Sequence, residues 1–153
     1  MRLRFALVSD LPEMQKLYSE TIQAICIDDY NQQQIDVWKA TAQNAERWRN
    51  VVHEQLAIVA EKNRKVIGFG TLKDGNYIDF FYVHKDFQGQ GIACKILSQL
   101  ETQAIKSGNF NLTSDVSITA KPFFEKKGFL VIREQRNFKK GVELINYKMS
   151  KTL

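Results

Sequence analysis

The chain has 153 residues, 44% of them hydrophobic, and a formal net charge of +5. This length and composition suit one globular domain, residues 1–153, with a full core and no second domain. The segment Met1–Phe5 lacks the apolar run of a signal peptide, and no stretch approaches the length needed to cross a membrane. We therefore expect a cytoplasmic protein without a membrane partner.

Two features of the composition bear on partners. Cys26 and Cys94 are too few for a disulfide framework and lack the spacing of a metal site, so we expect reduced thiols and no metal. Basic residues dominate the chain from Ile118 onward, where only Glu125, Glu134 and Glu143 carry negative charge. Such a surface can meet cofactor phosphates or nucleic acid, or it can simply be solvated.

The first third of the chain reads as one strand followed by helices. Leu3 to Val8 is a short strand, and Ser9-Asp10-Leu11-Pro12 provides a cap and a proline at a helix start. Apolar residues at helical spacing predict a first helix that ends near Asp28 and Asp29. A second helix, running from about Ile35 toward Val52, continues or restarts on the way.

Three strands in a meander follow, over Leu56–Ala60, Val66–Leu72 and Tyr77–Val83, with turn residues between them. A glycine-rich turn and a helix to about Ser107 then lead to a strand near Leu112–Val116, a crossover typical of parallel pairing. The remaining prediction is a helix and a hairpin, over Thr119–Lys127, Phe129–Phe138 and Val142–Met149.

The turn Phe87–Ala93 joins a strand to a helix start. The first backbone N–H groups of a helix lack internal partners and lie at the positive end of its dipole, so the turn is suited to an anion. Gly89 and Gly91 have no Cβ and allow phosphate oxygens to approach the amides. The dinucleotide fingerprint is broken at its third glycine, and no P-loop is present. An ordinary tight turn is the alternative interpretation.

Two motifs resemble those of the Gcn5-related N-acetyltransferase (GNAT) family. Gln88-Gly89-Gln90-Gly91-Ile92-Ala93 is similar to its acyl-CoA turn, Arg/Gln-x-x-Gly-x-Gly/Ala. Ala120–Phe129 looks like its late helix, Ala-x-x-Phe-Tyr-Glu-Lys-x-Gly-Phe. The resemblance implies an α/β (α+β) acyl-CoA N-acyltransferase fold. In that fold a mixed, mostly antiparallel sheet of about seven strands has helices on both faces, and strands 4 and 5 splay apart.

The resemblance also implies where acetyl-CoA binds. Its pantetheine arm would pair with main-chain groups of Phe81, Tyr82 and Val83, and its phosphates would meet the turn residues Gln88, Gly89, Gln90, Gly91, Ile92 and Ala93. Ser117 stands where relatives often have asparagine, and it can still form a hydrogen bond to the cofactor. Phe124 stands where many relatives have the tyrosine that protonates the CoA thiolate. It keeps a packing role but has no proton to give.

Acetyl transfer needs a deprotonated amine, an oxyanion donor and a leaving thiolate. Asp79 is the first candidate for the base, because strand alternation places it on the same side as Phe81 and Val83. Weaker candidates are Asp115, His84 and Glu143. A main-chain N–H near Val83 would hold the oxyanion, and water or the hydroxyl of Tyr82 or Tyr147 would supply a proton.

The resemblance places the amine acceptor near the helices between residues 20 and 50, where Tyr30 and Trp38 are expected to contact it, and Trp48 is a further aromatic candidate. These aromatic residues can equally be core. Asp28, Asp29 and Asp36 could recruit a polyamine or an aminoglycoside if they face the acceptor.

Three functions remain open. The first is an N-acetyltransferase that moves the acetyl group of acetyl-CoA to a primary amine of a small molecule or peptide, by direct transfer in a ternary complex, with CoA as product. The second is a catalytically weak acyl-CoA-binding sensor or interaction module, motivated by Phe124. The third, a nucleic-acid-binding domain, lacks any supporting motif, so we expect no nucleic acid. We expect a monomer or a homodimer, the latter through Val142–Met149.

Overall fold

The computed structural model describes residues 1–153, and its seven strands form one sheet in the order β1-β2-β3-β4-β5-β7-β6. The strands are β1 (Arg2–Phe5), β2 (Leu56–Lys62), β3 (Lys65–Lys73), β4 (Tyr77–Val83), β5 (Asn111–Ser117), β6 (Leu130–Lys139) and β7 (Val142–Thr152). The helices are α1 (Leu11–Ile25), α2 (Gln32–Lys39), α3 (Ala45–His53), α4 (Ile92–Lys106) and α5 (Lys121–Lys126).

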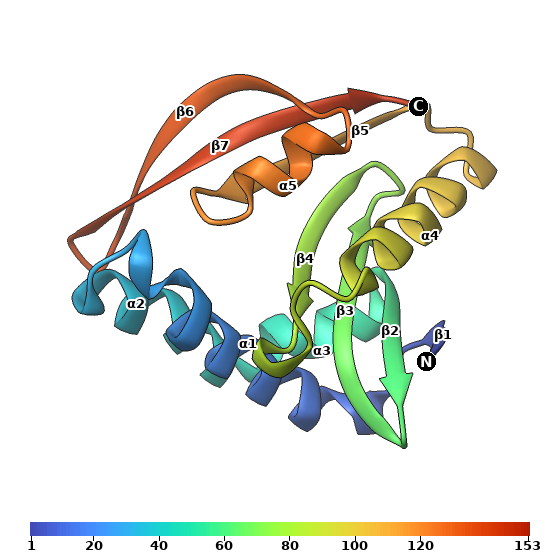
Figure 1. Cartoon of the computed structure of the whole chain (residues 1–153), viewed down its shortest axis with the longest axis horizontal. Helices are drawn as coiled ribbons and strands as arrows, with labels where there is room; N and C mark the ends of the chain where they lie inside the picture. The colour runs from blue at the N-terminus through green and yellow to red at the C-terminus, as the bar shows by residue number, and fades with distance from the viewer.

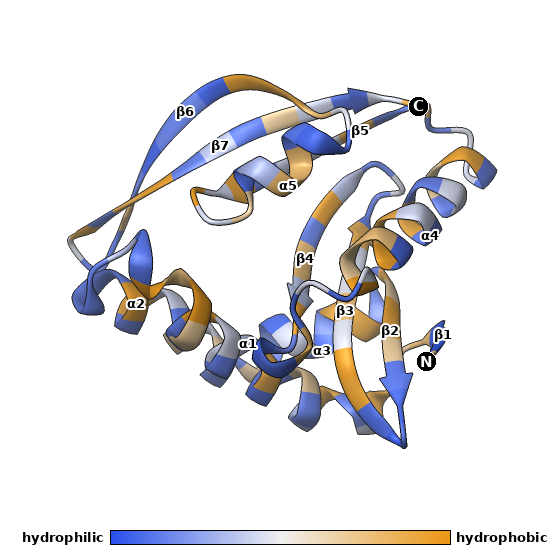
Figure 2. Ribbon diagram, viewed as in Figure 1, coloured by the Kyte–Doolittle hydropathy of each residue, from blue (hydrophilic) through white to orange (hydrophobic).

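Helices cover both faces of the sheet (Figure 1). The first three pack on one face around a buried cluster that includes Met14, Ile35 and Trp48. Helices α4 and α5 cover the other face around Ile96, Leu100 and Phe124. The apolar residues of α4 face the sheet and its hydrophilic residues face away, as Figure 2 shows by colour. Two apolar layers thus sandwich the sheet, as expected for this fold class.

The sheet is antiparallel except between β4 and β5. These two strands pair only at Tyr77 with Thr113 and at Ile78 with Ser114. Beyond Ile78 they diverge, and β5 continues with β6 and β7 as a separate wing of the sheet (Figure 1). The predicted mixed sheet, parallel crossover and splay between the fourth and fifth strands are confirmed.

A β-bulge interrupts β4 in the middle. The register with β3 shifts between Gly70 and Leu72, and the N–H of Phe80 donates to the Thr71 hydroxyl instead of to a main-chain carbonyl. Asp79 lies on the α3 side of the sheet, bonded to Arg47, whereas Phe81 packs on α5. The expectation that Asp79 shares a face with Phe81 and Val83 is therefore wrong, because a bulge breaks the two-residue alternation.

The N-terminal region differs from the predicted boundaries. Strand β1 ends at Phe5, and Val8–Asp10 forms a 3₁₀ turn because the Asp10 carboxylate accepts the N–H of Leu7 and turns the chain into α1. The expected second helix is two helices, α2 and α3. Side chains of Asn31 and Asn44 cap their respective N-termini, so the helix ends and restarts between them.

The C-terminal hairpin places β7 inside the sheet, between β5 and β6. Asn146–Met149 pair with both neighbouring strands, whereas Val142–Ile145 pair with β6 alone, so the dimer contact through Val142–Met149 stays a prediction. At this end of the sheet the edge strand is β6, which exposes Leu130 and Ile132. No helix is long and apolar enough to cross a membrane.

Candidate active site

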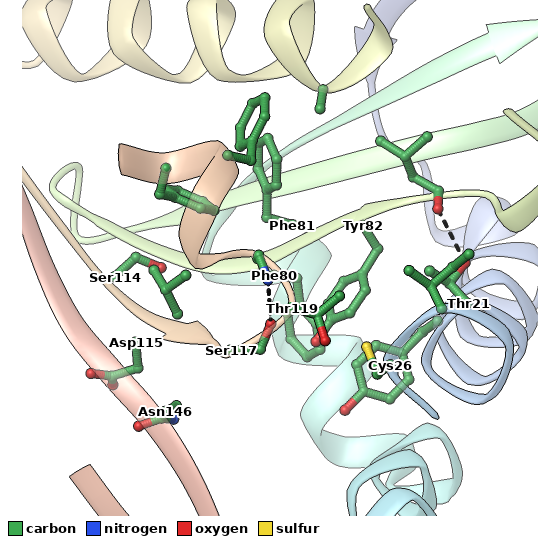
Figure 3. A pocket seen from close by; sticks show the side chains of 18 of the residues that line it. Thr21, Cys26, Phe80, Phe81, Tyr82, Ser114, Asp115, Ser117, Thr119 and Asn146 are labelled. Carbon is green, nitrogen blue, oxygen red and sulfur yellow. Dashed lines mark hydrogen bonds between the residues drawn. The ribbon is translucent and has the colours of Figure 1, made fainter. Parts of the chain in front are cut away.

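A cavity of about 800 Å³ opens where β4 and β5 separate. Its walls come from the turn before α4, strand β4, the helical region from α1 to α3, the β5–α5 segment and the β6–β7 hairpin. Figure 3 shows side chains converging from β4 (Phe80, Tyr82), from α1 and the turn that follows it (Thr21, Cys26) and from the β5–α5 segment (Ser117, Thr119). The splay of the sheet therefore creates one continuous space.

The glycine-rich turn lies at one end of this cavity. Gly89 and Gly91 have φ values of +71° and +79°, a backbone conformation that glycine adopts without steric cost. No atom lies within 4 Å of a Cβ built at either position, so the backbone is open to a ligand. Gly91 is the N-cap of α4 and supplies no side chain to the first helical N–H groups. These orphan donors are free for an anion, and the residues present fit a phosphate group.

The main-chain edge of β4 forms one side of the cavity. The N–H of His84 bonds the carbonyl of Ile67 on β3 at 2.8 Å, so the main-chain groups of Val83 and Phe81 point away from β3 in the alternating antiparallel pattern. The Val83 carbonyl accepts bonds from the Thr21 hydroxyl at 3.2 Å (Figure 3) and from the Gln88 side chain at 2.7 Å. Gln88 thereby braces the turn against the end of β4.

Phe124 and Ser117 also line the cavity. Phe124 is 2% exposed and packs edge-on against Phe81 and Phe129. The Ser117 hydroxyl accepts the N–H of Ala120 at 3.1 Å, which starts the turn into α5 (Figure 3). Ile92 and Ala93 line the cavity at the start of α4, whereas Gln90 is exposed outside it.

Asp79 is tightly engaged by the protein. Both guanidinium nitrogens of Arg47 bond its two oxygens, at 2.6 and 2.8 Å, and Gln55 donates a third bond at 2.7 Å. Burial by itself raises the pKa of this carboxyl, but the bonds from Arg47 and Gln55 outweigh it and hold the pKa below its ordinary value. A carboxylate held in this way is a weak base, and three of its roughly four acceptor positions are already used.

The three weaker base candidates, Asp115, His84 and Glu143, lie in different places. Asp115 lines the cavity but accepts bonds from Tyr77 and Gln135. His84 faces a separate, smaller pocket. Its Nδ1 accepts the N–H of Asp86, and burial lowers the pKa of the imidazole. Glu143 is not part of the cavity wall. None of these groups is an unengaged base beside β4.

The far end of the cavity contains the two predicted acceptor residues, Tyr30 and Trp38, with their rings in edge contact. The Tyr30 hydroxyl donates to the Ile145 carbonyl at 2.6 Å and accepts the N–H of Ile118 at 3.0 Å. This hydroxyl therefore joins β7 to the β5–α5 segment, and a ligand can meet only the ring. Trp48, by contrast, is 1% exposed and belongs to the core.

Several cavity residues were missed by the sequence analysis: Thr21, Cys26, Thr41, Arg47, Thr119, Asn137, Lys139 and Asn146. They come from helices, 3₁₀ turns and the last hairpin, which the fold brings together. Neither a motif nor a spacing in the sequence connects them. No group of three or more His, Cys, Asp or Glu residues is arranged to hold a metal ion.

Residues 26–151 match the family model described as an acetyltransferase (GNAT) domain. The chain belongs to the GNAT family. It is 31% identical, over 140 residues, to the uncharacterized N-acetyltransferase YafP of Escherichia coli, covering 92% of this chain and 88% of YafP. As a GNAT protein, the chain is an acetyl-CoA-dependent N-acetyltransferase.

Solved structures agree with this assignment. A GCN5-related N-acetyltransferase from Rhodopseudomonas palustris superposes with a TM-score of 0.95 at 29% identity, covering 99% of this GNAT chain and 95% of that one. The PaiA N-acetyltransferase of Thermoplasma acidophilum, solved in complex with coenzyme A, has a TM-score of 0.80 at 18% identity, with both chains fully covered. The second likeness shows the fold shared by these GNAT proteins.

Proposed function

We propose that this protein transfers the acetyl group of acetyl-CoA to a primary amine of a small molecule or peptide, within a ternary complex and as a single domain. The continuous cavity between the Gln88 turn and the β6–β7 hairpin is the observation that carries the proposal. It gives one ligand a phosphate-binding end and leaves an aromatic end for a second ligand. We retain the expectation of a cytoplasmic location.

The orphan N–H groups at the start of α4 would bind acetyl-CoA phosphates, with Gly89 and Gly91 allowing close approach. The pantetheine arm would lie along the edge of β4 that β5 leaves unpaired, beside the main-chain groups of Phe81 and the N–H of Val83. The expected main-chain contact with Tyr82 does not fit, because its main-chain groups face β3. Phe124 and Phe81 would pack against this arm, and the Ser117 hydroxyl would donate to it. PaiA, with bound coenzyme A, is consistent with a cofactor site in this fold.

In the reaction, the amine nitrogen bonds to the thioester carbonyl carbon, the C–S bond then breaks, and the nitrogen gives up one proton to water as it becomes an amide nitrogen. A main-chain N–H of β4 near Val83 would stabilise the oxyanion. The departing thiolate takes up a proton, which Phe124 cannot supply. Tyr82 lines the cavity, and burial raises its pKa well above the ordinary value, so its hydroxyl stays protonated and can donate a hydrogen bond to the thiolate, while water supplies the proton. Tyr147 is not part of the cavity wall.

We assign Asp79 to positioning rather than to proton abstraction, because its oxygens are bonded to Arg47 and Gln55. Apolar surroundings disfavour an ammonium ion, so the acceptor would lose its proton to water on entering the cavity. A covalent intermediate is not required. Burial raises the pKa of the Cys26 thiol to about 11, which keeps it protonated and poorly nucleophilic.

A matched pair of variants tests the cofactor site. Aspartate and asparagine both tolerate the positive φ of Gly91 and have nearly the same shape, but only aspartate adds negative charge. We expect Gly91→Asp to bind acetyl-CoA at least about tenfold more weakly than Gly91→Asn, because its carboxylate repels phosphate. Calorimetric titration measures both affinities, and circular dichroism confirms that both variants fold.

Equal acetyl-CoA affinities for the two variants would remove the turn from the binding site. Thiol release with a panel of amines then separates the two remaining functions. Release with any amine supports the enzyme. Tight acetyl-CoA binding without release from any amine would instead favour the catalytically weak acyl-CoA-binding module that Phe124 suggests.

A further inference from the structure

The aromatic end of the cavity contains a lysine ammonium group that no carboxylate of the protein contacts. Four formally charged side chains line the whole cavity: Arg47, Asp79, Asp115 and Lys139. Both oxygens of Asp79 are bonded to Arg47, and both oxygens of Asp115 accept bonds from neutral side chains. Neither carboxylate contacts Lys139, so this ammonium group retains its charge toward the cavity.

Lys139 is held at the end of β6 by a single hydrogen bond, from its Nζ to the Thr41 hydroxyl. An ammonium group has three donors, so two remain for a ligand. The group is partly buried, and burial together with repulsion from Lys140 and Arg47 lowers its pKa. An anion bound here would relieve that repulsion and satisfy the free donors.

Acidic residues that could attract a polycation lie elsewhere. Asp28, Asp29 and Asp36 are exposed, and none of them lines the cavity. Asp29 accepts the hydroxyl of Thr119, and Asp36 accepts the side chain of Gln32. The suggestion that these residues recruit a polyamine or an aminoglycoside into the cavity is therefore unsupported by their positions.

The wall beside Lys139 is aromatic. The Tyr18 ring makes edge contacts with Tyr82 and Phe80, and Trp38 adds its ring to the same end of the cavity. The guanidinium of Arg47 stacks over Phe80 at 4.4 Å from the ring centroid. An apolar ligand body fits against these rings, with a charged group extending toward Lys139.

We propose that the acetyl acceptor is an amine that also carries a carboxylate, such as an apolar amino acid or a short peptide, and that Lys139 and Thr41 bind this carboxylate. The inference rests on the proposed function and specifies its acceptor class. Arg47, already paired with Asp79, contributes positive potential without being the primary contact. Lys139 is a specificity residue and takes no part in the bond changes.

Three amines with one aromatic body test the class: phenylalanine, phenylalaninamide and phenethylamine. Thiol release is measured at saturating acetyl-CoA. The amine of the amide is the most readily deprotonated of the three, so intrinsic reactivity at neutral pH favours the amide. We expect the highest kcat/KM with phenylalanine, against that trend. Glycine, β-alanine and γ-aminobutyrate then measure which separation of amine and carboxylate the site accepts.

Variants at two adjacent lysines identify the contact. Lys139→Met keeps the length of the side chain and removes its charge, Lys139→Arg restores charge, and Lys140→Met is the control because Lys140 is exposed and outside the cavity wall. Lys139→Met should lower kcat/KM for phenylalanine by roughly tenfold or more, the usual effect of losing a charged hydrogen bond. It should affect phenethylamine much less. Lys139→Arg should recover part of the loss, and Lys140→Met should resemble the parent.

Each other outcome has a definite meaning. The acceptor class is overturned if Lys139→Met lowers kcat/KM equally for phenylalanine and phenethylamine. It is also overturned if the protein clearly prefers amines without a carboxylate. Either result leaves the assignment as an acetyltransferase intact. Weaker acetyl-CoA binding by Lys139→Met in calorimetry assigns Lys139 to the cofactor and also overturns the acceptor class. If no amine is turned over, the CoA-saturated protein is titrated by NMR with N-acetylphenylalanine and with its amide. Binding of the acid that is abolished in Lys139→Met supports the carboxylate site. Absence of such binding overturns the site.

Discussion

Asp10 joins three parts of the chain at the entrance to α1. Its two oxygens accept bonds from the Arg4 guanidinium, both at 2.8 Å, and one also accepts the N–H of Leu7 at 2.7 Å. The residue is 8% exposed. The bonds from Arg4 hold the pKa of this carboxyl below its ordinary value despite burial.

The lowered pKa predicts how stability depends on pH. A depressed carboxyl pKa stabilises the folded state at neutral pH, and this contribution is lost as pH falls from about 4 through the folded-state value. We expect Asp10→Asn to be less stable than the parent at pH 7 and to lose less stability on acidification. Urea unfolding at several pH values measures both effects. Asp28→Asn, at an exposed position, is the control and should follow the parent curve.

Asp79 shows where prediction from single residues stops. Its identity, in an otherwise apolar strand, correctly marks it as a residue of the cavity wall. Its direction depends on the bulge opposite Thr71, and its protonation depends on Arg47, which lies 32 positions earlier in the chain. Neither the bulge nor the ion pair has a local signature, because both arise from the packing of β4 against β3 and α3.

At the scale of elements, the packing of α4 on β3 positions the glycine-rich turn Phe87–Ala93. Gly70 allows the helix to approach closely: a Cβ at this position would lie 2.7 Å from Cγ2 of Ile96 and 3.0 Å from Cδ1 of Leu100. Both partners are completely buried, so neither has room to move. The glycine therefore sets the distance between helix and sheet, and with it the position of the turn that precedes α4.

We expect Gly70→Ala to lower the free energy of unfolding by about 1–3 kcal/mol, because the added methyl group overpacks this interface. It should also weaken acetyl-CoA binding by displacing the start of α4. Ile96→Leu removes the Cγ2 methyl group, so Gly70→Ala/Ile96→Leu should be more stable than the sum of the two single changes predicts. Denaturant unfolding measures this coupling, and strictly additive effects would show that the close contact does not limit the packing.

At the scale of the molecule, the β6–β7 wing closes the cavity by docking on the N-terminal helices. Tyr30 bonds the main chain at Ile145 and Ile118, Gln34 donates to the Glu143 carbonyl at 2.8 Å, and Lys139 bonds Thr41. Since β4 and β5 share only two residue pairs, these contacts help to hold the two wings of the sheet together.

Tyr30→Phe should destabilise the fold by about 1–3 kcal/mol, because two buried main-chain groups lose their partner. The loss should be accompanied by faster amide exchange in β7 near Ile145 and by a higher KM for the acceptor. Unfolding, hydrogen exchange and steady-state kinetics measure these effects. Tyr147→Phe is the control, since the Tyr147 hydroxyl makes one long, exposed bond of 3.3 Å to Glu134. Equal effects of the two changes would contradict the bridging role of Tyr30.

The contacts of the basic C-terminal region also become clear only in the whole molecule. Lys151 bonds Glu101 on α4 at 2.7 Å, Arg136 lies 3.8 Å from Glu143, and Lys121 lies 3.9 Å from Glu125. Lys139 faces the cavity. Of the basic segment that the sequence shows, three residues are therefore ion-paired and one faces the cavity, while Lys126, Lys127, Arg133, Lys140 and Lys148 form no ion pair.

The sequence alone determined most of the elements and the place of the glycine-rich turn Phe87–Ala93. Strand Tyr77–Val83, the helix after Gly91 and the hairpin around Gly141 follow from apolar periodicity and turn residues, which act over a few positions along the chain. The two GNAT motifs are equally local, because a phosphate site at a helix start is made by consecutive backbone amides.

Only the tertiary structure decided the acceptor end. The Asp79–Arg47 pair, the Tyr30 bridge and the free charge of Lys139 each join residues between 32 and 115 positions apart. Such contacts depend on how the two wings of the sheet and their helices pack. A hydrophobic pattern in the sequence constrains which face of an element is buried, but it does not specify which polar groups meet when two elements pack together. The cofactor end could be predicted from local chemistry, whereas the acceptor end emerges from the fold.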